Sequence, residues 1–336
     1  MNTSPWIVSA LTAGLLAVAG AGCGPEEVEP QAAGLLPAMT SRLPEAANGE
    51  IAFGRGNHVW VVHSDGSGLR RLTTRPPNVR GEFGWTQPAW PADGTRLALV
   101  LITYPTHEYG EIVIASATGR PERVVVGPST SPGSPAWSPA GTELAFAHMS
   151  DLTLLNLVDL GTGEERLLPL ADYTDERLGQ VGVFDSTPAW SPDGKWLSFS
   201  RNRFDLSTGR FDWNRSRLYV VRPDGRDLTP LAALSGSDPS WSRDGKRIAF
   251  EDRGDLYFVD AAGVHRLTNT RGVSETSPSW SPDGSKLVFE RENTSAPRDR
   301  NGYRPTDIWT VNANGTGAKK VVADGIGPAW RPLPRR

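Results

Sequence analysis

The sequence has almost no cysteine: Cys23 is the only one among 336 residues. The body of the chain therefore has no disulfide and no thiolate metal site. The net formal charge is only −3, which gives no support to a nucleic-acid partner, because such proteins need a basic surface to neutralise phosphates. Helical periodicity is almost absent, and 36 glycines, 28 prolines and 12 tryptophans indicate many turns between aromatic-rich strands.

The usual signatures of catalysis are also missing from the sequence. The five histidines show no HExxH or HxxxH spacing, and the chain has no G-x-S-x-G elbow, no P-loop and no dinucleotide fingerprint. We therefore predict no catalytic residue, no metal site and no cofactor. The chain is expected to be a non-enzyme, although the question of enzymatic activity is left open.

The N-terminus has the features of an export signal. An apolar stretch from Ile7 to Ala19 and the small residues Gly20-Ala21-Gly22 precede Cys23, which resembles the signal peptide and lipobox of a bacterial lipoprotein. The apolar stretch is too short to span a bilayer comfortably. We predict a signal peptide over 1–22 and a periplasmic or outer-membrane protein, attached to the membrane only by a lipid on Cys23. An ordinary cleaved signal and a misplaced start are the alternatives.

Residues 23–49 and the rest of the chain differ in character. The segment 23–49 is rich in Pro, Ala and Glu and has no sustained period, which favours a flexible tether. After it, variants of Pro-Ala/Ser-Trp-Ser-Pro-Asp-Gly recur, and the spacings between their tryptophans are 47, 53, 51, 39 and 50 residues. The motif tryptophans are Trp90, Trp137, Trp190, Trp241, Trp280 and Trp330.

Each repeat continues with an apolar run and two further short strands, and four strands per 40 to 50 residues are typical of a β-propeller blade. The first unit, near Glu50, lacks the Pro-Ala-Trp strand, whereas the last fragment, from Pro328, is such a strand without a successor. The sequence therefore predicts an all-β, six-bladed β-propeller over 50–332, expected to be a monomer, whose first blade is closed by the C-terminal strand.

The repeated P-A/S-W-S-P-D-G-x-x-L/I-x-F resembles the propeller repeat of the TolB family, from about Glu50 to Pro332. This resemblance implies a non-enzymatic scaffold of the cell envelope with a protein or peptide partner, such as a peptidoglycan-associated lipoprotein. Related propellers also serve in peptidases of the prolyl-oligopeptidase type and in polysaccharide lyases. A carbohydrate-active enzyme or a glycan-binding propeller that uses the central funnel is therefore the alternative.

The conserved part of the repeat is predicted to be structural. Ser-Pro-Asp-Gly forms the turn between the first and second strands of a blade, where Asp accepts local hydrogen bonds and Gly takes positive φ. Asp93, Asp193, Asp244 and Asp283 are therefore interpreted as turn residues. The six motif tryptophans are interpreted as packing between neighbouring blades.

The opposite face, where the repeats differ, is predicted to bind the partner. It carries the residues just before each motif proline and the loops between the second and third strands, of which 201–217 and 291–306 are long and rich in arginine and aromatics. A solvated surface is the alternative. The candidate binding residues are Gln87, Ser134, Asp185, Asp238, Glu275, Arg201, Arg203, Trp213, Arg300 and Tyr303. If Asp185, Asp238 and Glu275 converge on the channel, they could hold Ca²⁺, although solvated polar groups are the simpler interpretation.

Overall fold

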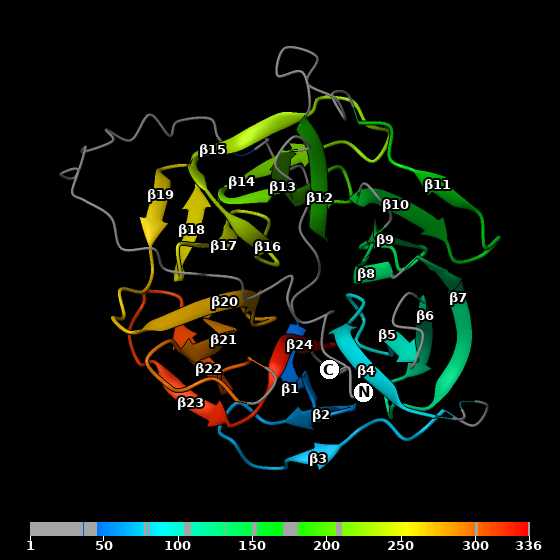
Figure 1. The fold of residues 1–336 in the computed structure, drawn as a ribbon, viewed down its shortest axis with the longest axis horizontal. Helices are drawn as coiled ribbons and strands as arrows, with labels where there is room; N and C mark the ends of the chain where they lie inside the picture. The colour runs from blue at the N-terminus through cyan, green and yellow to red at the C-terminus, as the bar shows by residue number, and fades with distance from the viewer. Residues whose placement is uncertain are drawn as a thin grey trace.

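The fold is described from a computed structural model. It covers residues 36, 46–76, 79, 81–103, 109–130, 132–149, 153–170, 181–205, 210–299 and 302–334. These residues form 24 strands in six four-stranded antiparallel sheets, which are arranged as blades around a central axis (Figure 1). The predicted six-bladed propeller is confirmed. None of the residues covered forms a helix that is long and apolar enough to cross a membrane.

Within each blade the strands follow one another from the channel outward. Blade 1 contains β24 (Ile326–Pro334), β1 (Ala46–Arg55), β2 (His58–Val62) and β3 (Arg70–Arg71). Blade 2 contains β4 (Phe83–Ala89), β5 (Arg96–Thr103), β6 (Tyr109–Ser116) and β7 (Pro121–Thr130). Blade 3 contains β8 (Pro132–Trp137), β9 (Glu143–Met149), β10 (Thr153–Asp159) and β11 (Glu165–Leu167).

The second half of the ring repeats this order. Blade 4 contains β12 (Val181–Trp190), β13 (Leu197–Asp205), β14 (Arg210–Val221) and β15 (Thr229–Ser235). Blade 5 contains β16 (Ser237–Trp241), β17 (Ile248–Asp252), β18 (Asp255–Asp260) and β19 (Gly263–Arg266). Blade 6 contains β20 (Val273–Trp280), β21 (Lys286–Asn293), β22 (Thr306–Asn312) and β23 (Lys319–Val322).

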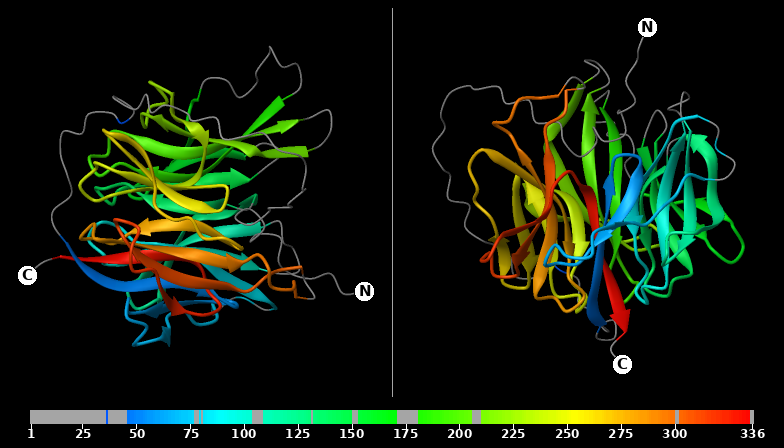
Figure 2. Two further views of the ribbon diagram at one scale, coloured as in Figure 1. Left: turned by 90° about the vertical axis from the view of Figure 1, so that its left-hand side faces the viewer. Right: turned by 90° about the horizontal axis from the view of Figure 1, so that it is seen from below.

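The two ends of the propeller meet in blade 1, where β24 pairs antiparallel with β1 (Figure 2). The register places Ile51 opposite Trp330 and extends to Ala46 opposite Pro334. The predicted closure by the C-terminal strand is therefore confirmed. The pairing also carries the propeller slightly beyond the predicted limits of 50 and 332.

The Ser-Pro-Asp-Gly turns have the predicted role. In blade 4, Asp193 Oδ1 accepts hydrogen bonds from the Ser191 hydroxyl at 2.8 Å and from the Lys195 backbone N–H at 3.1 Å. Gly194 has a φ of +71°, which a side chain would strain. The corresponding aspartates of the other blades accept equivalent bonds: Asp93, Asp244 and Asp283.

The motif tryptophans lie between the blades, as predicted. Trp137 of blade 3 is buried and packs on a cluster that includes Ala98 and Val100 of blade 2. Its indole N–H donates to the Ala89 carbonyl of blade 2 at 2.9 Å. The indole N–H of Trp330 also has an acceptor, the Gly49 carbonyl at 3.1 Å. Those of Trp90, Trp190, Trp241 and Trp280 have no hydrogen-bond partner among the described residues, so the tryptophans stabilise the blade contacts mainly by the apolar area that they bury.

The segment 201–217 differs from its predicted form. It was expected to be a loop, but β13 continues to Asp205 and β14 starts at Arg210, and Phe204 lies opposite Phe211. Aromatic residues in alternation favour strand over loop because cross-strand aromatic pairs stabilise a sheet. Blade 4 therefore carries an extended hairpin.

Candidate functional site

A ring of backbone bulges surrounds the channel. The residue before each motif proline has positive φ, between 48° and 57°, and the strand register shifts there in every blade. These six ring residues are Gln87, Ser134, Thr187, Asp238, Ser277 and Gly327. Five of them are not glycine, so their backbone conformation is unfavourable in isolation. Because a bulge re-aims a side chain, the ring turns these side chains to one cavity.

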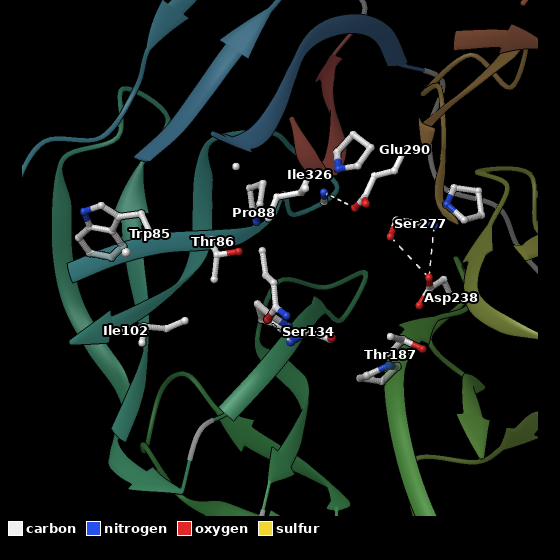
Figure 3. A pocket seen from close by; sticks show the side chains of 18 of the residues that line it. Trp85, Thr86, Pro88, Ile102, Ser134, Thr187, Asp238, Ser277, Glu290 and Ile326 are labelled. Carbon is white, nitrogen blue, oxygen red and sulfur yellow. Dashed lines mark hydrogen bonds between the residues drawn. The ribbon is translucent and has the colours of Figure 1, made fainter. Parts of the chain in front are cut away.

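The cavity has a volume of about 230 Å³ and is lined by all six ring residues. Gly56 and Asn57, in the turn between β1 and β2, also line it, so it opens on the face that carries the loops between second and third strands. Asp238 and Glu290 line one part of the wall, and Trp85 and Ile102 line the part across from them (Figure 3). This cavity is hereafter called the mouth.

Hydrogen bonds between neighbouring blades hold the ring in place. At four of the six boundaries, the backbone N–H of a ring residue donates to a side chain of the preceding blade. These bonds are Ser134 N–H to Gln87 Oε1 at 2.6 Å, Asp238 N–H to Ser200 Oγ at 3.1 Å, Ser277 N–H to Asp238 Oδ2 at 3.3 Å and Gly327 N–H to Glu290 Oε1 at 2.5 Å. The ring is therefore a rigid rim rather than a set of independent loops.

Two carboxyl groups in the mouth have perturbed acidity. Burial, reinforced by the nearby Glu290, raises the pKa of Asp238 to about 6. Burial also raises the pKa of Glu290, despite hydrogen bonds from Gly327, Ser277 and Thr276. In both groups the main cause is the hydration that a charged carboxylate loses on burial; the like charge of Glu290 adds to the shift of Asp238, and that of Glu292 adds to the shift of Glu290.

Three of the ten predicted binding residues line the mouth: Gln87, Ser134 and Asp238. Asp185 and Glu275 do not, because each is fully buried in an ion pair within its own blade. Arg201 donates to both Asp185 carboxylate oxygens at 2.7 and 2.8 Å. Arg291 donates to Glu275 Oε1 from Nε and Nη2 at 2.9 and 2.5 Å.

The three carboxylates considered for Ca²⁺ therefore do not come together. In the ranges covered by the structure, no three His, Cys, Asp or Glu side chains form a group that could hold a metal. Arg201 has a structural contact as well, since its guanidinium lies over the rings of Phe199 and Tyr219. Neither the Asp185–Arg201 pair nor the Glu275–Arg291 pair lines the mouth.

The remaining predicted residues lie away from the mouth or outside the described chain. Arg203 and Trp213 belong to β13 and β14, but their side chains are not described. Tyr303 is partly buried in the loop after β21, where its N–H donates to Asp299 Oδ1 at 2.9 Å. Arg300 and Cys23 lie outside the described residues.

Glu290 is the residue of the mouth that the sequence interpretation missed. It follows Phe289, whose ring is fully buried between blades, so strand alternation turns Glu290 to the opposite side. The position after the phenylalanine of the repeat is therefore the signal that could have found it. Its counterpart in blade 4 is Ser200, which makes the equivalent interblade bond.

The other end of the channel is narrowed by a residue that departs from the repeat. Arg243 replaces the proline of Ser-Pro-Asp-Gly in blade 5, and its Nη2 donates at 3.4 Å to the Ala92 carbonyl of blade 2. These two blades lie opposite each other in a ring of six. The motif tryptophans and Arg243 line a cavity of about 170 Å³ at this end. The two ends of the channel therefore differ in size and in lining.

No sequence profile of a known protein family matches this chain. Among solved structures, TolB from Acinetobacter baumannii superposes with a TM-score of 0.61 at 21% identity, over 84% of this chain and 66% of that one. A putative TolB from Agrobacterium tumefaciens gives 0.57 at 20% identity, over 85% and 98% of the two chains. A chain of a nidogen/laminin complex gives 0.61 at 12% identity, over 84% and 98%.

These similarities confirm the resemblance to TolB-type propellers at the level of the fold. This chain spans slightly less than two thirds of the length of the Acinetobacter protein. Identities of this size show a shared architecture, and one propeller architecture can carry unrelated functions. Function has to be argued from the mouth itself.

Proposed function

We propose that this chain is a non-enzymatic propeller of the cell envelope, tethered by a lipid on Cys23, that binds a segment of a protein partner in the mouth. The observation that carries the proposal is the concave mouth of about 230 Å³, whose rim is fixed by bonds between blades. A preformed pocket binds without the cost of ordering its own walls. Its size suits one side chain or a short segment rather than a folded domain.

The lining favours binding over catalysis. Prolines and aliphatic side chains alternate with a few polar groups, which is the usual composition of a ligand pocket. The polar groups already accept or donate structural hydrogen bonds, and the residues that line the mouth include no histidine or cysteine. The carbohydrate-active alternative needs a cluster of His, Arg or carboxylate side chains that lines the funnel, and among the described residues the mouth supplies only Asp238 and Glu290. Asp185 is instead buried against Arg201, and His148, at the end of β9, does not line the mouth.

The repeat offers a variant that blocks the mouth. Gly327 is the one ring residue without a side chain, and no atom lies within 4 Å of the position where its Cβ would be. Its φ of 57° resembles the values at which the other five ring residues carry side chains, and asparagine tolerates such values. Gly327→Asn should therefore fold normally and place an amide in the mouth.

The test is photo-crosslinking in envelope fractions, with the crosslinker at Asn57 on the exposed rim. We expect a protein adduct that Gly327→Asn abolishes. It should persist with Gly163→Asn, a glycine of similarly positive φ and open surroundings in the β10–β11 turn. A crosslinker at Asn314, in the turn between β22 and β23, should give no such adduct. An adduct unaffected by Gly327→Asn would contradict binding in the mouth.

A further inference from the structure

Among the residues that the structure describes, the mouth holds two acidic groups and no basic one. Asp238 and Glu290 lie on blades 5 and 6. Ser277 donates to Asp238 Oδ2 from its backbone N–H and from its hydroxyl (Figure 3). The Ser277 side chain also hydrogen-bonds to Glu290. Glu290 is only 5% exposed, and no Lys, Arg or His is among the residues that line the mouth. Buried carboxylates are normally paired with a cation. In the same molecule, Asp185 and Glu275 follow that rule through Arg201 and Arg291.

The structural task of these two carboxylates does not require a charge. Each accepts an interblade N–H bond, from Ser277 and from Gly327 respectively. At two other boundaries the same bond is made to a neutral oxygen, that of Gln87 or Ser200. Neutral acceptors therefore suffice for the ring, and the ionised groups in blades 5 and 6 carry a charge that the architecture leaves uncompensated.

The part of the mouth across from the carboxylates is apolar. Trp85 is 1% exposed and Ile102 is 6% exposed, and both lie across the cavity from the carboxylates. Ile326 and the prolines of the ring extend this apolar surface. A ligand that matches both parts has a cationic head and an aliphatic stem. Lysine and arginine side chains have this form, because their methylene stems pack on apolar surface while the head reaches a polar partner.

We propose that the mouth selects a Lys or Arg side chain of the partner polypeptide, whose cationic head lies between Asp238 and Glu290 and whose stem packs towards Ile102 and Ile326. This proposal rests on the proposed function, since it names the group that the mouth recognises. The raised pKa of Asp238, about 6, agrees with a buried carboxylate that has no cationic partner. A bound cation would restore both groups to full ionisation at neutral pH.

The experiment uses the purified protein and a positional-scanning library of short N-acetylated peptides, so that side chains supply the only ammonium or guanidinium groups. We expect peptides with one basic position to bind, with loss of binding in Gly327→Asn. Matched peptides then carry Lys, Arg, norleucine or Glu at that position. Replacement of Lys by norleucine should weaken binding roughly tenfold or more, the scale of a desolvated charge pair.

The variant Asp238→Asn/Glu290→Gln tests the residues. Its amide oxygens can still accept the Ser277 and Gly327 N–H bonds, so the ring should persist. We expect the variant to bind Lys and norleucine peptides equally, whereas Asp93→Asn, which removes one carboxylate at the far end of the channel, should keep the preference.

The outcomes separate the two proposals. Peptides that bind in the mouth without preferring Lys or Arg over norleucine would overturn this inference and leave the proposed function standing. A preference that survives in Asp238→Asn/Glu290→Gln would do the same. Displacement of Lys peptides by Ca²⁺, lost in that variant, would point to a metal site instead. If no peptide binds in a way that Gly327→Asn blocks, the proposed function itself fails.

Discussion

Glu251 occupies the same place in blade 5 that Glu290 occupies in blade 6, directly after the phenylalanine of the repeat. Its two oxygens accept hydrogen bonds from the Ser237 hydroxyl and the Gly254 N–H, both at 2.6 Å. Burial, and the nearby negative charges of Asp238 and Asp252, raise the pKa of Glu251 from 4.5 to about 7. At the scale of single residues, blade 5 therefore contains a carboxyl group, that of Glu251, which titrates close to neutral pH.

We predict that this carboxyl group makes the protein less stable as pH rises from about 4.5 to about 7. In that interval the folded chain still holds a proton that the unfolded chain has released, so the free energy of unfolding falls with pH. In Glu251→Gln the amide oxygen can accept the Gly254 N–H and the amide N–H can donate to the Ser237 hydroxyl oxygen, so both contacts persist and the titration is removed. The variant should be more stable than the parent at pH 8, on the order of 2 kcal/mol, and equal to it near pH 4.

The measurement is urea unfolding of both proteins across the pH range. The control is Glu165→Gln on the exposed strand β11, which should shift the curve little and leave its slope unchanged. Asp238, with its pKa raised to about 6, should leave some slope in Glu251→Gln. Parallel curves for the parent and Glu251→Gln would show that Glu251 does not titrate in this interval.

The ring residues show what sequence reasoning can find at this scale. Gln87, Ser134 and Asp238 were located because each precedes a motif proline, a position that the repeat defines without any structure. Their positive φ could not be foreseen, because the residue before proline normally prefers extended backbone. The bulge comes from the shift of register between the first and second strands, which is a property of the blade.

At the scale of an element, blades 4 and 6 each contain a buried ion pair at the same position of the repeat. Asp185 and Glu275 stand three residues before the motif proline, and Arg201 and Arg291 stand two after the motif phenylalanine. This shared spacing is visible in the sequence. The pairing itself was not predicted, because the bulge between Ser186 and Ala189 decides that Asp185 lies opposite Arg201.

We predict that Arg201→Met destabilises the protein strongly, by about 3–5 kcal/mol, because it leaves Asp185 buried without its cation. Asp185→Leu/Arg201→Met should recover most of that loss, since a buried ion pair is often replaceable by apolar side chains of similar volume. Chemical denaturation of the single and double variants measures the coupling.

The matched control is Arg226→Met, the same substitution in the exposed pair with Asp224. There Arg226 is 78% exposed, so solvent screens the pair and we expect little change in stability. If Asp185→Leu/Arg201→Met is as unstable as the sum of its single variants, the cost lies in packing around Phe199 and Tyr219 rather than in the uncompensated charge.

At the scale of the whole molecule, the number of blades and the closure were predictable because each copy of the sequence repeat corresponds to one blade. Six Pro-Ala/Ser-Trp strands, the last of which is an unmatched final fragment, leave few other arrangements. The sequence predicted the face of the propeller on which the mouth lies, but it did not predict the mouth itself. Its acidic and apolar parts arise from residues of all six blades, among them Trp85, Asp238 and Glu290, and their positions depend on the sum of all blade geometries.

Closure by β24 should decide the stability of the whole ring. Removal of residues 326–336 exposes the edge of β1 and takes away Trp330, which is 5% exposed and packs on Ile51 and Val288. We expect the truncated protein to unfold at a lower temperature and to self-associate, because a free inner edge invites pairing between chains. Size-exclusion chromatography and thermal unfolding measure both effects.

A peptide with the sequence of residues 326–334 should reverse these effects when it is added to the truncated protein. It can restore the β1 pairing, in which Ala52 lies opposite Ala329, and refill the space of Trp330. Stability should then rise with peptide concentration, since binding to the folded form alone stabilises it. The same peptide with Trp330→Ala should bind about a hundredfold to a few thousandfold more weakly, because loss of a buried tryptophan costs about 3–5 kcal/mol. Equal rescue by both peptides would mean that backbone pairing alone closes the ring, and no rescue by either would mean that β24 must be in place while the blades assemble.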